Sequence, residues 1–324
     1  MAVTYIQAIN QAMREEMERD DNVFVLGEDV GVLGGAFKAT EGLQAAFGAE
    51  RVVDTPISES LIVGAGVGMA IQGMRPILEM QFIDFISCGF DQIVNMAATL
   101  RYRHGGQTAC PIVVRGPCGG GVHGGLYHSQ NPEAWFFHVP GLKVVAPSTA
   151  YDAKGLLKSA VRDDDPVIYL EHKFLYRRIK EDLPAEEFLV PIGKAALRKE
   201  GRDLTVITYG SPMHAVMKAA RDMAKEIDIE VIDLRTLLPL DWKTIRTSVE
   251  KTGKALIVHE ARKTGGIGGE IAARIAEELF ESLDGPVMRL AAKDTHNAFA
   301  GPMEDYILPN QEKVVEAIRR LAAY

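Results

Sequence analysis

One acidic residue stands at the start of a segment that is otherwise apolar and rich in small residues. The segment, DTPISESLIVGAGVGMA, covers residues 54–70 and carries Glu59. Thr55 and Pro56 suit an N-cap and a first helical position, and an acid in the first turn complements the helix dipole. A carboxylate buried behind such a helix without a partner costs several kcal/mol. We therefore expect Glu59 to face a ligand that donates a hydrogen bond to it.

Two histidines lie in a glycine-rich loop further along the chain. RGPCGGGVHGGLYHSQNPEAWF, residues 115–136, follows an expected strand and carries His123 and His128. Loops at the carboxyl ends of parallel strands are where α/β proteins place their sites. From the residues alone, a functional and a structural role for these imidazoles both stay open.

Two other glycine motifs give weaker signals for a nucleotide. GAGVGM (64–69) has Met69 where the pattern G-x-G-x-x-G needs its third glycine, so we interpret its small residues as helix-packing positions. TGGIGGEIAARIAEEL (264–279) opens a helix after an expected strand, which suits an anion, but its spacing is not that of a dinucleotide fingerprint. We interpret it as a tight turn. A nucleotide-dependent oxidoreductase is thus the weakest alternative.

Composition excludes several classes of protein. The 324 residues are 47% hydrophobic and 25% charged, as in globular proteins, and the net charge of −8 speaks against a nucleic-acid partner. Three cysteines without C-x-x-C spacing predict neither a disulfide framework nor a zinc site. The sequence shows no apolar run of the roughly 18–20 residues that a membrane span needs, and no signal or transit peptide. We expect a cytoplasmic protein.

The elements that position these residues follow an alternating pattern. Apolar β-branched runs alternate with helical patterns, which predicts an α/β fold with parallel sheets. In the first half we expect strands at 23–26, 76–82, 111–115, 142–147 and 166–171, and helices at 5–18, 58–72, 88–102 and 151–162. In the second half we expect strands at 204–210, 229–235, 254–260 and 286–292, and helices from about 213 and at 241–250, 264–282 and 310–322. The predicted division is two domains, 1–182 and 201–324, joined by a linker at 183–200.

Several motifs resemble one family, in order and over essentially the whole chain. They are LGEDVG (26–31), DTPISES (54–60), RPILEMQFIDF (75–85), RYRHGGQ (101–107), HSQNPEA (128–134), PGLKVVAPSTAYDAKGLLKSA (140–160) and DLRTLLPLD (233–241). The chain is similar to the beta subunit of the decarboxylating component of 2-oxo acid dehydrogenase complexes. The resemblance implies a pyrimidine-binding domain followed by a transketolase C-terminal-like domain.

The resemblance also implies a cofactor and partners. An alpha subunit would complete an α2β2 heterotetramer that shares thiamine diphosphate between chains, and acyl groups would pass to lipoyl groups of a dihydrolipoyl acyltransferase core. Glu59 matches the residue that hydrogen-bonds the pyrimidine N1′ of the cofactor. Phe85 matches the aromatic residue on the pyrimidine, and Ile57 and Gln81 match its neighbours. His128 matches the active-site histidine beside the substrate channel, whereas the role of His123 stays open.

Metal ions enter only through the resemblance. The chain has no G-D-G motif, with which thiamine enzymes hold the diphosphate through Mg²⁺, so the alpha subunit would hold Mg²⁺. Some members carry potassium in this subunit, bound mostly by carbonyl oxygens. Asp165 stands where many relatives have asparagine. The matching positions are Ile112, Ala160, Val161, Asp163 and Asp165.

Other features leave alternatives open. His296 and Asn297 lie in DTHNAF (294–299), where the family usually reads D-T-P-x-P-F with a rigid pair of prolines.

The expected substrate is pyruvate, with branched-chain 2-oxo acids and acetoin as alternatives. A self-sufficient transketolase relative would need the missing G-D-G motif. A non-catalytic scaffold with the same fold would have no use for a buried acid at Glu59.

Overall fold

The parallel sheet expected in the first half of the chain is present in the computed structural model, which describes residues 2–324. Its strands lie in the order β6-β7-β5-β4-β2-β3, and every neighbouring pair is parallel. A short antiparallel pair, β1 with β8, lies outside this sheet. The bounds are β1 (Val3–Thr4), β2 (Val23–Gly27), β3 (Val52–Asp54), β4 (Arg75–Glu79), β5 (Val113–Cys118), β6 (Lys143–Val145), β7 (Val167–His172) and β8 (Lys180–Glu181).

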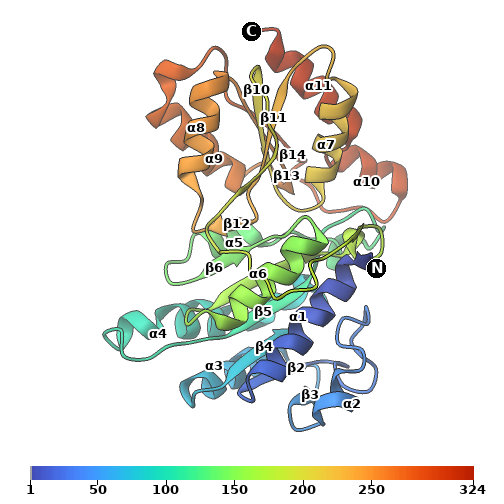
Figure 1. Ribbon diagram of the computed structural model, residues 1–324, viewed down its shortest axis with the longest axis vertical. Helices are drawn as coiled ribbons and strands as arrows, with labels where there is room; N and C mark the ends of the chain where they lie inside the picture. Colours follow the sequence, from blue (N-terminus) through green and yellow to red (C-terminus); the bar gives the residue numbers. More distant parts are fainter. Residues whose placement is uncertain (1) are drawn as a thin grey trace. The chain divides into compact units, whose positions relative to one another are not determined.

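Two long helices cover one face of this sheet. Helices α1 (Tyr5–Arg19) and α6 (Ala150–Arg162) pack against each other (Figure 1) and bury their apolar stripes with the side chains of one strand face. Thr4 and Gln7 form a capping box that begins α1. Thr149 caps α6 by accepting from the backbone of Asp152 at 3.1 Å. Both predicted helices are therefore confirmed to within a residue or two.

The apolar helix behind Glu59 packs closely against the sheet. Helix α3 (Glu59–Ile71) contacts β4, and a Cβ at Gly66 would lie 2.5 Å from Leu78. This close approach confirms the packing role for Gly66, whereas nothing lies within 4 Å of a Cβ at Gly68. The helix expected over 88–102 is instead divided among a 3-10 segment η1 (Ile83–Gly89), a π-helical segment η2 (Gln92–Ala97) and α4 (Ala98–Arg103).

The second half of the chain contains a five-stranded sheet in the order β14-β13-β10-β11-β9. Figure 1 shows α7 and α11 on one of its faces and α8 and α9 on the other. Strand β9 pairs antiparallel with β11, whereas the sequence predicted only a linker there. The bounds are β9 (Ala196–Lys199), β10 (Leu204–Thr208), α7 (Pro212–Asp222), β11 (Ile229–Asp233), α8 (Trp242–Thr252), β13 (Ala255–Arg262), α9 (Ile267–Glu278), β14 (Met288–Ala292) and α11 (Gln311–Ala322).

The chain divides into two units that are not continuous in sequence. The first holds the described residues up to Cys118 together with Trp135–Ile192, and the second holds Gly119–Ala134 and Gly193–Tyr324. The histidine loop thus belongs to the second unit, although it lies within the predicted first domain. None of the helices described is long and apolar enough to cross a membrane. The remaining short elements are α2 (Leu43–Phe47), η3 (Gly125–Tyr127), α5 (Glu133–Phe137), η4 (Lys173–Leu175), β12 (Thr236–Leu238), η5 (Phe280–Ser282) and α10 (Gly301–Ile307).

Candidate active site

The strand order of the first unit determines where a ligand can bind. From β2 the chain crosses to β3 on one side and then returns to β4 on the other, so the order reverses between β2 and β4. Ligands of open α/β sheets bind beyond the carboxyl ends of the strands at such a switch point. Glu28 directly follows β2, and Gln81 lies two residues after β4. The sequence-predicted residue Gln81 is thus at the switch point.

Glu59 is the first residue of α3, but the expected cap is wrong. Ser58 is the N-cap, and no side chain caps the helix there. Thr55 instead directly follows β3, and its N–H donates to the carbonyl of Gly27 at 2.9 Å. Because the chain stays bonded to β2 through Thr55, the cap and the first helical residue lie three residues later than Thr55 and Pro56. The Glu59 side chain is half-buried rather than buried, and it forms no ion pair within residues 2–324.

A second carboxylate, Glu28, lies at the same edge of the sheet as Glu59 and is not among the residues predicted from the sequence. Glu28 is 7% exposed, and its Oε1 atom has no hydrogen-bond partner among the described residues. Burial, followed by the nearby charges of Glu59 and Asp29, raises the pKa of Glu28, and a hydrogen bond from the Ser58 backbone opposes this shift. An acid directly after a buried strand at the switch point was the signal that could have identified it.

The other predicted cofactor neighbours lie on the segments beside this acidic pair. Gln81 donates from Nε2 to Asp29 Oδ2 at 3.1 Å, and Asp29 has a left-handed backbone with φ of 57°. Phe85 is half-buried in η1, which packs against α3. Ile57 lies in the segment before Glu59 and is 83% exposed, so any contact it makes must be with something other than this unit.

A buried ion network lies under the same edge of the sheet. Arg115 on β5 forms ion pairs with Glu79 on β4 and Glu171 on β7, and all three side chains are at most 5% exposed. Tyr176 donates its hydroxyl to Glu171 at 2.6 Å. Burial raises the pKa of Glu79, and the charge of Arg115 opposes that shift. A Cβ at Gly35 would lie 2.7 Å from Glu79, so the network also supports the loop that follows Glu28.

The histidine loop is held within the second unit. His128 is half-buried and follows η3. His123, with a left-handed φ of 59°, places Nδ1 2.8 Å from Glu304 Oε2. Glu304 belongs to α10 and is 1% exposed, which makes His123 a partner of a buried acid.

The five positions matched to potassium surround a cluster of cationic side chains. Arg75 donates to the carbonyls of Val161 and Asp163 at 3.1 and 3.0 Å. Lys143 lies 2.6 Å from the Asp163 carboxylate and 3.3 Å from that of Asp165, which also pairs with Arg101. The carbonyl of Ile112 accepts from Val167, and that of Ala160 accepts from Asp163. Protein cations and N–H groups therefore already contact these oxygens. Within residues 2–324 no group of three or more His, Cys, Asp or Glu side chains could hold a metal ion.

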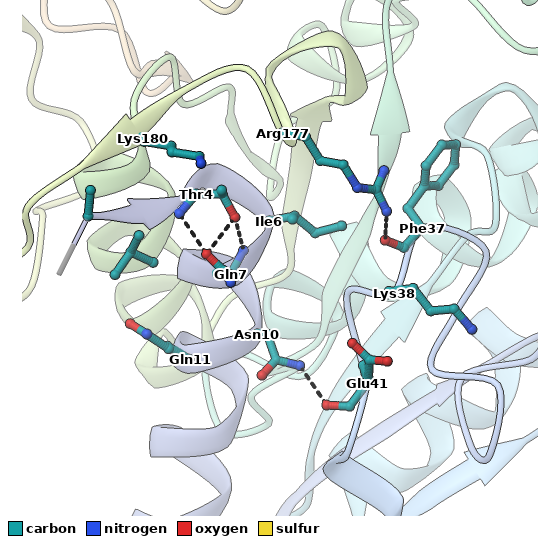
Figure 2. A pocket seen from close by; sticks show the side chains of 12 residues that line it. Thr4, Ile6, Gln7, Asn10, Gln11, Phe37, Lys38, Glu41, Arg177 and Lys180 are labelled. Atoms are coloured by element: carbon teal, nitrogen blue, oxygen red, sulfur yellow. Dashed lines mark hydrogen bonds between the residues drawn. The ribbon is translucent and has the colours of Figure 1, made fainter.

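A cavity of about 780 Å³ lies elsewhere in the first unit, beside the start of α1 (Figure 2). Its lining includes Lys38, Arg177 and Lys180, with Glu41 as the only acid. Arg177 donates to the carbonyl of Phe37 at 3.1 Å. None of the sequence-predicted site residues lines this cavity.

Comparison with known proteins agrees with this arrangement. Residues 1–178 match the family model of the transketolase pyrimidine binding domain, and residues 193–314 match that of the transketolase C-terminal domain. A 2-oxoisovalerate dehydrogenase subunit beta from Bacillus subtilis is 55% identical, with 99% of each chain covered. A pyruvate dehydrogenase E1 component subunit beta from the same organism is 48% identical, again with 99% of each chain covered.

A solved structure supports the fold. It is described as a split gene transketolase, an inactive beta4 tetramer, and it covers 100% of this chain and 99% of its own at a TM-score of 0.78 and 20% identity. The transketolase-like arrangement of two α/β domains is thereby confirmed. The chain belongs to the family of beta subunits of the thiamine-diphosphate-dependent first component of 2-oxo acid dehydrogenase complexes.

Proposed function

We propose that Glu59 is the catalytic carboxylate of a thiamine diphosphate site to which this chain contributes the pyrimidine half. The observation that carries the proposal is the pair of Glu59 and Glu28 at the switch point of the sheet. Two neighbouring carboxylates, one with an unpartnered buried oxygen, fit a ligand that donates hydrogen bonds. When bound, thiamine diphosphate supplies an electron sink for the electrons released by loss of CO2.

The chain's residues then bind and orient this group. The carboxylate of Glu59 would accept a hydrogen bond from the pyrimidine and so help to hold a proton on that ring. The raised pKa of Glu28 reflects its burial and the negative charge of Glu59, so a ligand that donates a hydrogen bond here would relieve both. Phe85, Ile57 and Gln81, the last of which is fixed by Asp29, would contact the same group.

Partners complete the proposed enzyme. The alpha subunit, in an α2β2 heterotetramer, holds the diphosphate through Mg²⁺, because this chain has no G-D-G motif. His128 assists acyl transfer to lipoyl groups of a dihydrolipoyl acyltransferase core. The three free cysteines support a cytoplasmic enzyme.

The substrate is a 2-oxo acid, and we propose a branched-chain 2-oxo acid first and pyruvate second. The 2-oxoisovalerate dehydrogenase relative shares 55% of its residues with this chain, and the pyruvate dehydrogenase relative shares 48%. Rates of the assembled enzyme with 2-oxoisovalerate, pyruvate and acetoin decide among them. A higher kcat/KM for pyruvate than for 2-oxoisovalerate would reverse this order.

Potassium at Ile112, Ala160, Val161, Asp163 and Asp165 is a separate proposal. An ion there must compete with Arg75 and Lys143 for oxygens that these side chains already contact. Thermal unfolding in potassium chloride and in sodium chloride at equal ionic strength tests it. A higher Tm in potassium supports the ion, and equal values show that the chain's own cations have taken its place.

The role of Glu59 is tested in the assembled enzyme with an artificial electron acceptor. Glu59→Gln removes the carboxylate while keeping the shape of the side chain. It should abolish most thiamine-dependent decarboxylation and leave assembly with the alpha subunit intact. A rate near that of the wild type would refute the assignment.

A further inference from the structure

The loop that carries His128 has few side chains with which to hold its own shape. Gly119, Gly121 and Gly125 have left-handed φ values of 84°, 77° and 67°, and His123 has one of 59°. Glycine-rich backbone of this kind is conformationally free. The position of His128 therefore depends on the hydrogen bonds and packing contacts that other residues of the second unit make with the loop.

Two buried carboxylates hold the loop at its beginning and at its end. Glu260 accepts from the backbone N–H of Gly120 at 2.5 Å and from Asn131 Nδ2 at 2.9 Å. Glu304 accepts from the N–H of Gly121 at 3.0 Å and contacts His123. Charge-assisted hydrogen bonds of this type are stronger than neutral ones. They fix the loop at Gly120, Gly121 and His123 before His128 and at Asn131 after it.

The segment just before α10 holds the loop on both sides of His128. Asn297, 2% exposed, donates from Nδ2 to the carbonyl of Ser129, the residue after His128. The ring of Phe299 occupies the space next to Gly125, three residues before His128. The loop also folds back tightly, because a Cβ at Gly124 would lie 2.9 Å from that of His128. His128 thus lies between two points that one short segment fixes.

We propose that Asn297 is a positioning residue for His128, acting through the carbonyl of Ser129, with Phe299 as the second anchor. The inference rests on the proposed role of His128 in acyl transfer. An active-site group displaced by about 1 Å can lose about 100-fold in rate. In this segment His296 and Ala298 stand where the family's pattern has prolines, so the amide donor of Asn297 between them would supply part of the rigidity that prolines give.

The test compares three variants in the enzyme assembled with its alpha subunit. Asn297→Asp keeps the side-chain shape but replaces the donor with an oxygen that faces the Ser129 carbonyl. Phe299→Ala removes the second anchor from a ring that is 62% exposed, so it cannot unfold the core. His296→Ala is the matched control, because His296 is exposed and adjacent to Asn297. His128→Ala is measured beside them as the reference for loss of the imidazole.

Two readouts separate positioning from general damage. Hydrogen exchange of the amides at 119–131, followed by mass spectrometry, should rise about 10-fold in Asn297→Asp and in Phe299→Ala, with the rest of the second unit unchanged. Transfer of the acyl group to a lipoyl domain should fall about 10-fold or more, whereas decarboxylation with an artificial acceptor stays near the wild-type rate. His296→Ala should change neither.

The outcomes distinguish this inference from the proposed function. Unchanged exchange at 119–131 in both Asn297→Asp and Phe299→Ala overturns it, whatever the activities. Faster exchange with normal acyl transfer, while His128→Ala is defective, also overturns it. If His128→Ala itself transfers acyl groups normally, the proposed role of His128 is wrong, and the exchange data alone decide whether Asn297 fixes the loop.

Discussion

Glu28 and Glu59 both lie at the carboxyl edge of the first sheet, and the charge of Glu59 raises the pKa of Glu28. One follows β2 and the other begins α3, so the pair exists only when the parallel order β3-β2-β4 has formed. A buried carboxylate with a raised pKa beside a second one is a common sign of a functional site. The pair therefore connects the fold to the proposed chemistry.

The Glu28 carboxyl should make stability fall as pH rises. Because its pKa is raised on folding, its contribution is fully present below the ordinary glutamate pKa of about 4.3 and is lost as pH rises through the folded value. Glu28→Gln cannot ionise and should raise the Tm at pH 7 relative to the wild type, with a smaller difference at pH 4. Thermal unfolding at both pH values checks this. An equal difference at both would show that the folded pKa is not raised.

His259 should have the opposite pH dependence. Burial lowers its pKa from 6.5 to about 4, so the folded state keeps it neutral while the unfolded state takes up a proton below about pH 6.5. Stability should fall on the order of 3 kcal/mol as pH drops from 6.5 towards 4. His259→Phe should flatten this part of the profile. Denaturant titrations between pH 4 and 6.5 measure the free energy of unfolding. If His259→Phe loses stability with falling pH as steeply as the wild type, other groups cause the effect.

The buried ion network should be costly to break. Arg115→Met leaves Glu79 and Glu171 without their cation, which should lower the free energy of unfolding by about 3–5 kcal/mol. Arg246→Met is the matched control, because its pair with Glu250 is exposed and should change stability by less than about 1 kcal/mol. Similar losses in both variants would mean that Arg115 does not neutralise its neighbours.

His128 should be needed for one half of the reaction only. In the assembled enzyme, His128→Ala should reduce acyl transfer to a lipoyl domain by about 100-fold, the usual range for loss of a proton-transferring group. Decarboxylation with an artificial acceptor should change little. Tyr127→Ala, on the neighbouring exposed residue, serves as the control. Equal losses in both assays would place His128 in the decarboxylation step instead.

Patterns of buried residues allowed most of the fold to be predicted. The apolar residues of some elements follow the spacing of a buried strand or of a helix with one buried face. Examples are β2, β7, α1 and α6, whose bounds lie within about two residues of the predicted ones. Strand β9 was missed because its pattern is only partly buried, and its partner β11 lies more than 30 residues away. The Ser58 cap was missed because the bond from Thr55 to Gly27 is a long-range contact.

The site could be predicted only in part for the same reason. Glu59, Phe85 and Gln81 were found through the family's motifs, but the partnership of Glu28 with Glu59 depends on the order of three strands. The anchoring of the histidine loop by Asn297 joins residues 168 positions apart in the chain. No local pattern encodes such a contact.

The central claim is that Glu59 faces a cofactor whose other end is held by a different chain. It is tested most directly by thiamine-dependent decarboxylation of 2-oxoisovalerate and pyruvate with an artificial electron acceptor. The purified chain is assayed alone, with its cognate alpha subunit, and as Glu59→Gln with that subunit. We predict activity only from the wild-type pair, and a decrease of roughly 100-fold or more in the variant. Activity from the chain alone, or a wild-type rate from Glu59→Gln, would contradict the account.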